Sequence, residues 1–309
     1  MRVVVALGGN ALSPPRATGS VEEMRAALTA TAGALADLVA AGTSLVLTHG
    51  NGPQVGRLLL QQERAAEEVP PMPMDVCGAL SQGQLGYLIA QALDNALRRR
   101  KLGSRVLTLV TQVVVDGRDP AFRRPSKPVG PSYEQDEARQ IAHTSGHVFT
   151  VQPDGRWRRV VASPRPVRLV EDGPLRALVE SGHVVVAAGG GGVPVVEHQG
   201  QLRGVEAVVD KDRTAGLLAA SVGADVLLVL TDAPRVQVGY GTPQARELTS
   251  MTVAQAQEWL AAGEFPEGSM GPKVEACVAF ARTGGRAAIG ALTDAADVLA
   301  GRAGTVVVP

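Results

Sequence analysis

Cysteine is almost absent from this chain of 309 residues, which has only Cys77 and Cys277. Two thiols are too few for a disulfide framework or a thiolate metal site, and they are typical of buried cysteines in a reducing compartment. The sequence also lacks an apolar run as long as a membrane span, and an apolar N-terminal segment of the signal-peptide kind. These absences predict a cytoplasmic protein that has no membrane partner.

Net charge is absent as well, because 30 Lys and Arg residues are balanced by 30 Asp and Glu residues. A balanced chain lacks the electrostatic footprint of a protein that binds nucleic acid or an anionic membrane, so neither is expected as a partner. Aromatic residues make up only 3% of the chain, whereas glycine (36) and proline (20) are abundant. This composition favours a fold in which many tight turns approach phosphate groups.

What the chain does have is a regular alternation of short apolar runs and amphipathic stretches. Apolar, β-branched runs are typical of strands buried on both faces of a parallel sheet, and they fall at Val3–Leu7, Ser44–Thr48, Arg105–Thr111, Val184–Ala188, Val226–Leu230, Ala287–Gly290 and Gly304–Val308. Helices are predicted at 21–41, Val55–Glu68, Cys77–Lys101, Leu175–Ser181, Thr214–Val222, Val253–Ala262 and Val274–Arg282. Strands that alternate with helices predict the α/β class, with a mainly parallel sheet between two helical layers.

Short loops of unusual composition follow four of the predicted strands. They are Gly8-Gly9, Gly50-Asn51-Gly52, Gly189 to Gly192, and Thr231-Asp232-Ala233-Pro234. Ligands of open α/β sheets bind at the carboxyl ends of the strands, and glycine lets bare backbone N–H groups come close to them. The recurrence therefore predicts a ligand site at this edge of the sheet. We interpret His49, a lone histidine beside the second loop, as a structural residue.

The segment from residue 116 to about residue 165 interrupts the alternation. It is broken by glycine and proline, is poor in apolar periodicity and carries the basic run Trp157-Arg158-Arg159. An irregular segment of this length inside a compact domain is usually functional, so we interpret it as a lid that stands off the main sheet. The alternative is a solvated basic excursion with no role in the site.

Three lysines in unusual local sequence indicate phosphoryl transfer. The Walker A pattern is not present. The Rossmann glycine spacing is not present either, because Pro194 stands where it needs its third glycine. Instead, Lys127, Lys211 and Lys273 lie among prolines, glycines and aspartates near the loops. Phosphoryl transfer depends on positioning and positive charge more than on covalent chemistry, and lysine supplies a compact point charge. For any single lysine a surface position is the simpler interpretation, but three together favour phosphoryl transfer.

Motifs in fixed order along almost the whole chain resemble those of the carbamate kinases, of the amino-acid kinase superfamily. They include Gly8 to Leu12, His49 to Gly56, Met74 to Gly83, Val110 to Asp116, Asp119 to Phe122, Lys127 to Pro131, Ser163 to Pro166, Gly189 to Gly192, Gly204 to Asp212, Leu230 to Asp232 and Gly268 to Glu275. The resemblance implies a three-layer α/β/α sandwich with a protruding subdomain at about residues 116–165, and a homodimer. It also implies an N-terminal lobe, about 1–200, for the carbamoyl substrate and a C-terminal lobe, about 201–309, for the nucleotide.

The activity implied by the resemblance is reversible phosphoryl transfer between carbamoyl phosphate and ADP, giving ATP and carbamate. The implied catalytic residues are Lys127, Lys211, Lys273 and Asp210, with the aspartate orienting lysines and not taking a proton. The substrate is expected at Gly8, Gly9, Asn10, Gly50, Asn51 and Gly52. The nucleotide is expected at Lys211, Thr231, Asp232, Ala233, Val236, Gly268, Ser269, Met270, Gly271 and Lys273. Mg²⁺ is expected to bridge the phosphates with few or no direct protein ligands.

The chain departs from the superfamily pattern at Ala6, where a lysine is common. We expect Lys127 of the subdomain to take over that charge, and to reach the site only when the subdomain closes. Two alternatives stay open: a kinase for another small carboxylate or amino acid, and a nucleotide-sensing protein without catalysis. An NAD(P) oxidoreductase is more distant because the glycine spacing fails.

Overall fold

The computed structural model describes residues 1–9, 12, 18–103, 106–266 and 268–309. In that part of the chain the central feature is an eight-stranded sheet, whose spatial order is β15 (Ser250–Thr252), β17 (Thr305–Val308), β16 (Arg286–Ala291), β12 (Val226–Thr231), β1 (Arg2–Leu7), β2 (Ser44–His49), β9 (Val184–Val186) and β3 (Val106–Thr108). Neighbouring strands run parallel, except that β16 and β17 are antiparallel. The predicted α/β class with a mainly parallel open sheet is confirmed.

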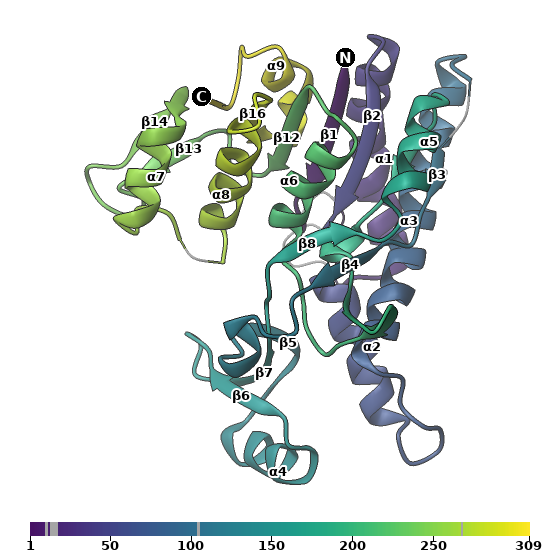
Figure 1. Cartoon of the computed structure of the whole chain (residues 1–309), viewed down its shortest axis with the longest axis vertical. Coiled ribbons are helices and arrows are strands. Elements are labelled where there is room, and N and C mark those ends of the chain that lie inside the picture. Colours follow the sequence, from purple (N-terminus) through teal and green to yellow (C-terminus); the bar gives the residue numbers. More distant parts are fainter. Residues whose placement is uncertain (10–11, 13–17, 104–105, 267) are drawn as a thin grey trace.

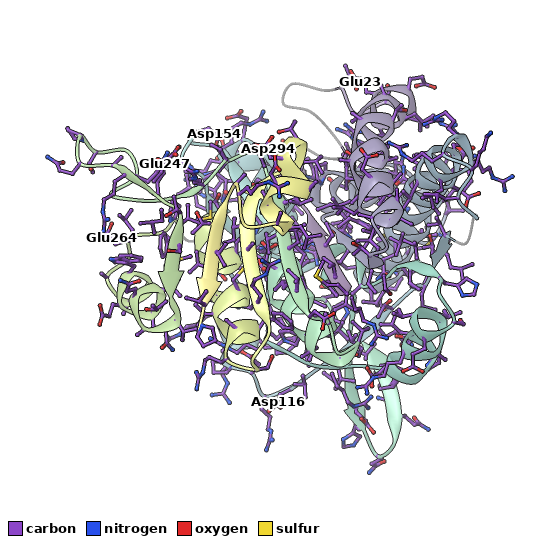
Figure 2. All side chains as sticks on the ribbon, turned by 90° about the horizontal axis from the view of Figure 1, so that it is seen from above. Glu23, Asp116, Asp154, Glu247, Glu264 and Asp294 are labelled. Carbon is purple, nitrogen blue, oxygen red and sulfur yellow. The ribbon has the colours of Figure 1, made fainter. Side chains whose placement is uncertain are left out.

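Strand β1 separates two hydrophobic cores because successive side chains of a strand point to opposite faces. Val3, Val5 and Leu7 pack into one core, and Val4 and Ala6 into the other. The first core lies under α1 (Val21–Ala40), α3 (Met74–Arg99) and α9 (Ala295–Leu299), and the second under α5 (Asp172–Glu180), α6 (Lys211–Ser221), α7 (Val253–Ala261) and α8 (Met270–Ala281). Figure 2 looks down on this sandwich, with Glu23 of α1 and Glu264 beyond α7 at opposite ends. A membrane span would need a longer apolar helix than any that the described residues form.

A second sheet connects the sandwich to the inserted segment. Its order is β11 (Gln201–Gly204), β10 (Val193–His198), β4 (Gln112–Val115) and β8 (Pro166–Leu169). Because β4 precedes the insertion in the chain and β8 follows it, this sheet forms the base from which the insertion protrudes (Figure 1). Outside these two sheets lie a hairpin of β13 (Val236–Val238) and β14 (Arg246–Leu248), and short 3₁₀ helices at η2 (Pro120–Arg123), η3 (Gly189–Gly191) and η4 (Leu292–Asp294).

The inserted segment, residues 116–165, is called the lid from here on. It contains β5 (Lys127–Tyr133), α4 (Gln135–Ser145), β6 (Val148–Val151) and β7 (Trp157–Val161), and its three strands form an antiparallel sheet in the order β5-β7-β6. Figure 1 shows it projecting from one end of the sandwich. The predicted protruding subdomain is confirmed, whereas its β-sheet is a finding that the sequence pattern did not indicate.

The lid rests on α2 (Gly52–Arg64) and on the segment before α6. Tyr133 Oη of β5 donates to Glu63 Oε2 at 2.6 Å, and Arg159 Nη2 of β7 lies 2.8 Å from Glu206 Oε2. The backbone of Gly130 packs 3.7 Å from where a Cβ on Gly56 would stand. The lid is therefore in contact with the body of the molecule in this structure.

Five helices begin earlier than predicted, because their first turns contain residues that the sequence pattern treats as loop. Helix α2 begins at Gly52 and not at Val55, and α8 begins at Met270 and not at Val274. Each has a proline in its first turn, where the missing N–H costs no hydrogen bond. Helices α3, α5 and α6 likewise begin three residues before their predicted starts. These early starts matter, because they bring the helix N-termini to the carboxyl edge of the sheet.

Candidate active site

The loops after β1, β2, β9 and β12 meet at one edge of the main sheet, as predicted. Gly8 N donates to the Leu230 carbonyl at 2.8 Å, and a Cβ on Gly8 would stand 3.0 Å from that oxygen. Gly50 N lies 3.4 Å from the Leu7 carbonyl oxygen. Hydrogen bonds between the strand ends thus fix the first two loops close together.

The four consecutive glycines at 189–192 are required by close contacts on three sides. A Cβ on Gly189 would come within 2.4 Å of His49 Nε2, one on Gly190 within 2.0 Å of Asn51 Nδ2, and one on Gly191 within 2.2 Å of the Val209 carbonyl oxygen. Gly190, Gly191 and Gly192 all have φ between 67° and 94°, a region that side chains disfavour. This turn packs the ends of β2, β9 and the segment before α6 against one another.

A buried polar network holds the backbone just before the turn of Gly189 to Gly192. The Gln82 side chain donates from Nε2 to the Thr111 carbonyl at 3.1 Å and accepts from Thr111 N at 2.8 Å. Thr111 Oγ1 in turn accepts from Ala188 N at 3.0 Å, and the Ala188 carbonyl accepts from Thr48 Oγ1 at 2.9 Å. Ala188 has φ of 52°, a conformation that persists only when its surroundings hold it.

Asn51 stands at the N-terminus of α2 and faces the site. Its Nδ2 donates to Ser81 Oγ at 2.7 Å, and Ser81 Oγ donates to the Gly78 carbonyl at 2.6 Å. The Asn51 side chain does not cap α2, so the first N–H groups of the helix are available to a ligand at the positive end of the helix dipole. A helix N-terminus of this kind attracts an anion.

Lys127 and Asp210 form an ion pair between the lid and the body. Lys127 Nζ donates to Asp210 Oδ2 at 2.9 Å, although 83 residues separate them. The other carboxylate oxygen, Oδ1, accepts from the backbone N–H groups of Asp212 and Arg213 and caps α6. Lys127 is therefore at the site in this structure, with the lid already against the body, whereas we expected it to arrive only on closure.

Lys211 and Lys273 share a second aspartate, Asp212. Lys273 Nζ donates to Asp212 Oδ2 at 3.0 Å, and Lys211 Nζ lies 3.4 Å from Asp212 Oδ1. Lys211 Nζ also donates to the Leu7 carbonyl at 3.0 Å, which places its charge at the end of β1. The Asp212 side chain is only 4% exposed. Asp210 thus pairs with one of the three lysines, and Asp212 with the other two.

Burial and charge shift the protonation of three groups here. Burial alone would raise the pKa of the Asp210 carboxyl, but the charge of Lys127 and the hydrogen bonds of the carboxylate hold that pKa below its ordinary value. Burial lowers the pKa of Lys211, and Asp212 opposes that change. Burial lowers the pKa of His49 to about 4, so its ring is neutral at pH 7, in agreement with a structural role.

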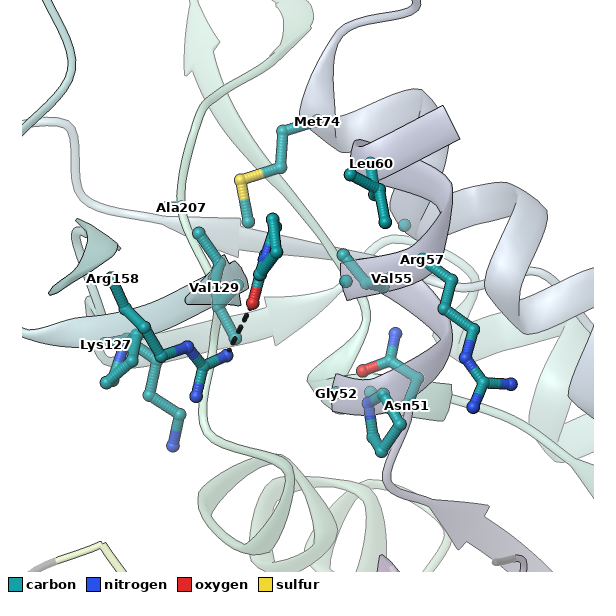
Figure 3. A pocket seen from close by; sticks show the side chains of 18 of the residues that line it. Asn51, Gly52, Val55, Arg57, Leu60, Met74, Lys127, Val129, Arg158 and Ala207 are labelled. Atoms are coloured by element: carbon teal, nitrogen blue, oxygen red, sulfur yellow. Dashed lines mark hydrogen bonds between the residues drawn. The ribbon is translucent and has the colours of Figure 1, made fainter. Parts of the chain in front are cut away.

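The larger cavity of the site lies between the lid and α2, and its volume is about 470 Å³. Lys127 and Arg158 enter it from the lid, while Asn51 and Gly52 lie across from them (Figure 3). Its other walls are mostly apolar, with contributions from Val55, Leu60, Met74, Val129, Pro131, Pro194 and Val208.

A smaller cavity of about 200 Å³ lies at the end of β12. It is lined by Gly8, Leu230, Thr231, Asp232, Ala291, Leu292 and Thr293. Of the residues expected at the nucleotide, Thr231 and Asp232 line this cavity. Gly268 and Ser269 precede α8, Met270 and Gly271 begin it, and the Ser269 carbonyl accepts from Lys273 Nζ at 3.3 Å. Val236 does not line it, because its side chain is fully buried in the hydrophobic core.

Some residues of this edge were predicted but not yet placed, and others were not predicted. Gly9 is described and exposed, whereas Asn10 lies outside the described residues. Several residues that contact the predicted residues or line the two cavities were not predicted: Asp212, Ser81, Arg158 and the segment 291–293. For Asp212 the sequence held a signal, since Asp210 and Asp212 flank Lys211 directly. Among the described residues, no group of three or more His, Cys, Asp and Glu side chains is arranged to hold a metal ion.

Comparisons with known proteins agree with this geometry. The model of the amino acid kinase family matches residues 1–289. A carbamate kinase of Pyrococcus horikoshii is 46% identical over 311 aligned positions, which cover 100% of this chain and 99% of the relative. One of Trichomonas vaginalis is 42% identical, with 100% of both chains covered. The structure of carbamate kinase from Giardia lamblia bound to AMP-PNP is similar with a TM-score of 0.94 at 38% identity, covering 99% of this chain and 98% of that one.

Proposed function

The chain belongs to the amino acid kinase family and, within it, to the carbamate kinases, and from this premise we propose how its residues transfer a phosphoryl group between carbamoyl phosphate and ADP. One observation carries the proposal. Three lysines from three separate segments, Lys127, Lys211 and Lys273, meet at the carboxyl edge of the sheet, each held by a buried aspartate. Lys127 lines the larger cavity, and Lys211 donates to the carbonyl of Leu7, the residue before Gly8 in the wall of the smaller cavity.

In the proposed reaction, a β-phosphate oxygen of ADP attacks the phosphorus of carbamoyl phosphate. The bond from phosphorus to the carbamoyl oxygen breaks, ATP forms, and carbamate leaves as an anion that breaks down to ammonia and CO₂. Lys127 and Lys273 contact the transferring group from opposite sides, and Lys211 polarises it. Negative charge moves between oxygens without a proton transfer, so fixed cations serve the reaction better than a general base.

The substrate is bound by backbone groups and by Asn51. Gly9 and Gly52 offer N–H groups near the N-terminus of α2, and Asn10 is proposed to join them. The N–H groups of Gly8 and Gly50 already bond to the Leu230 and Leu7 carbonyls, so these two glycines border the substrate and give it room by having no side chain. Ser81 orients the Asn51 amide through the bond from Asn51 Nδ2. Asp210 and Asp212 hold the lysines. Asp210 takes no proton, because its Oδ1 accepts backbone hydrogen bonds and its Oδ2 pairs with Lys127.

We place the nucleotide phosphates at Lys211, Lys273, the residues Gly268 and Ser269 before α8, and Met270 and Gly271 at its start, and we place the nucleoside near Thr231, Asp232 and Ala233. In this proposal Val236 supports the pocket from the core and does not contact the nucleotide. The Giardia lamblia relative is bound to AMP-PNP, which supports a nucleotide site of the same kind. Mg²⁺ would bind mainly through phosphate oxygens, as it ordinarily does with nucleotides, and would supply charge to those oxygens.

The assay that tests this function is ATP formation from ADP with a choice of phosphoryl donor. We expect kcat with carbamoyl phosphate in the range of about 1 to 1,000 s⁻¹. We expect kcat/KM for acetyl phosphate to be at least about tenfold lower than kcat/KM for carbamoyl phosphate, because a methyl group cannot use the polar contacts of the site. A preference for acetyl phosphate would favour the alternative of a kinase for another carboxylate. No ATP from any acyl phosphate, with normal ADP binding, would favour a nucleotide-sensing protein.

We further propose that the protein is a cytoplasmic homodimer that pairs at the β3 edge of the main sheet. Leu107 of β3 is 37% exposed and Tyr87 of the adjoining α3 is 55% exposed. A sheet edge with apolar neighbours is well suited to pair with a second copy. Light scattering of the purified protein is expected to give twice the mass of the chain, and Leu107→Arg to give a monomer. A wild-type monomer at micromolar concentration would contradict this proposal.

A further inference from the structure

We propose that Arg158 of the lid binds the carbamoyl end of carbamoyl phosphate, and the carbamate of the reverse reaction. The inference rests on the proposed function and deepens it, because it names the group that recognises the non-phosphate end of the substrate. It starts from the charges that line the larger cavity.

Among the described residues three cations line that cavity, and two of them already have partners. Lys127 is paired with Asp210 at 2.9 Å. The Arg57 guanidinium donates to the backbone carbonyls of Thr18 and Gly19. Arg158 differs, because within the described part of the chain it has no carboxylate partner: its Nη2 donates to the Gly130 carbonyl at 3.0 Å, and its buried Nε has no hydrogen-bond partner.

The backbone of the lid holds Arg158 at the cavity. Arg158 lies on β7 opposite Ser132 of β5, where the pairing of the two strands shifts between Val129 and Ser132. Gly130 lies in this irregular stretch with φ of 71°, and its carbonyl accepts from Arg158. Figure 3 shows the guanidinium beside Val129 and Lys127, facing the side of the cavity that carries Asn51 and Gly52.

The Arg158 guanidinium is suited to bind an oxygen anion. Arginine does not lose its proton, and a half-buried guanidinium among apolar walls is costly without a partner. Carbamate presents two oxygens in one plane, which suit the guanidinium fork, and carbamoyl phosphate presents a carbonyl oxygen. The phosphoryl end of the substrate is assigned to the lysines and the α2 N-terminus, so Arg158 is left for the carbamoyl end.

The test compares Arg158→Ala with a matched control, Arg156→Ala. Arg156 belongs to the same lid, donates to the Ser132 carbonyl at 3.0 Å and lies near Glu134, but does not line the cavity. We expect Arg158→Ala to raise the KM of carbamoyl phosphate roughly 10- to 100-fold, as for the loss of a charged hydrogen bond, with the KM of ADP within about twofold. Arg156→Ala is expected to leave both values unchanged.

Chemical rescue separates substrate binding from a structural role. Guanidinium added at millimolar concentration should lower the KM of carbamoyl phosphate for Arg158→Ala and not for the wild type or Arg156→Ala. Equal KM values in the two variants, or an equal rise in the KM of ADP, would overturn the proposal. If the wild type makes no ATP from carbamoyl phosphate, the proposed function fails by itself, and calorimetry then decides on Arg158: equal affinity of the wild type and Arg158→Ala for carbamoyl phosphate would overturn its role.

Discussion

Replacing Lys127 with alanine is expected to lower kcat about a thousandfold while the affinity for ADP stays within about twofold of the wild type. Lys127 Nζ reaches the site from the lid, and its partner there is Asp210. The proposed nucleotide contacts come from other segments. The variant therefore loses charge where the phosphoryl group transfers and keeps the ADP site. Steady-state rates and calorimetry with ADP measure the two effects separately.

The chain offers a matched control for this experiment, because it has four lysines against 26 arginines. The fourth, Lys101, is exposed just beyond α3, so Lys101→Ala should leave kcat unchanged. Lys127→Arg should recover little activity, because a planar guanidinium does not replace a compact ammonium. Near-normal turnover of Lys127→Ala would contradict this prediction and favour the alternative, in which the inserted segment is a solvated basic excursion with no role in the site.

Replacing Asp210 with asparagine is expected to lower kcat by roughly two to four powers of ten. Asparagine keeps the shape of the side chain and can still cap α6, but it removes the charge that holds Lys127. Because no proton transfer is proposed, the pH–rate profile of the variant should run parallel to that of the wild type. Thermal unfolding of both proteins controls for a change in the fold.

An altered shape of that profile would count against this account. If Asp210→Asn lost one whole limb of the wild-type pH–rate profile, Asp210 would be a general base. The carboxyl has a pKa below its ordinary value in the folded protein, so it stays ionised near neutral pH and is protonated only as the pH falls through that lowered value. A limb near neutral pH is therefore not expected from this group.

The order of strands and helices could be predicted because each signal is local. The apolar run Val3–Leu7, buried on both faces, is followed by the glycines that end it, and β1 forms where expected. The short strands β13, β14 and β15 were not predicted, because they lack the continuous apolar run that indicated β9, a strand of the same three-residue length. The hairpin of β10 and β11 was also missed, because its residues follow the four glycines that the analysis assigned to a loop.

The lid sheet was hidden by prolines. Pro128 and Pro131 lie within β5, and a proline argues against a central strand because it cannot donate to the sheet. The structure resolves this, since β5 is at the edge of the β5-β7-β6 sheet and needs only one hydrogen-bonded side. An edge strand with proline therefore looks like a loop in the sequence, and only the fold distinguishes the two.

The membership of the site could be predicted better than its pairing. The lysines stood out by their local sequence, but which aspartate holds which lysine depends on contacts across 83 residues for Lys127 and Asp210, and across 61 for Asp212 and Lys273. Ser81 lies inside a long helix, where nothing in the sequence marks it as the partner of Asn51. Such pairings follow from tertiary packing, and a sequence pattern does not carry them.

The central claim is that this site moves a phosphoryl group directly from carbamoyl phosphate to ADP. Phosphorus NMR of the purified protein with both substrates and Mg²⁺ tests it most directly. The account predicts that the carbamoyl phosphate signal falls as the γ-phosphorus signal of ATP rises by the same amount. Inorganic phosphate appearing at the rate of the protein-free control, with ADP unchanged, would contradict it.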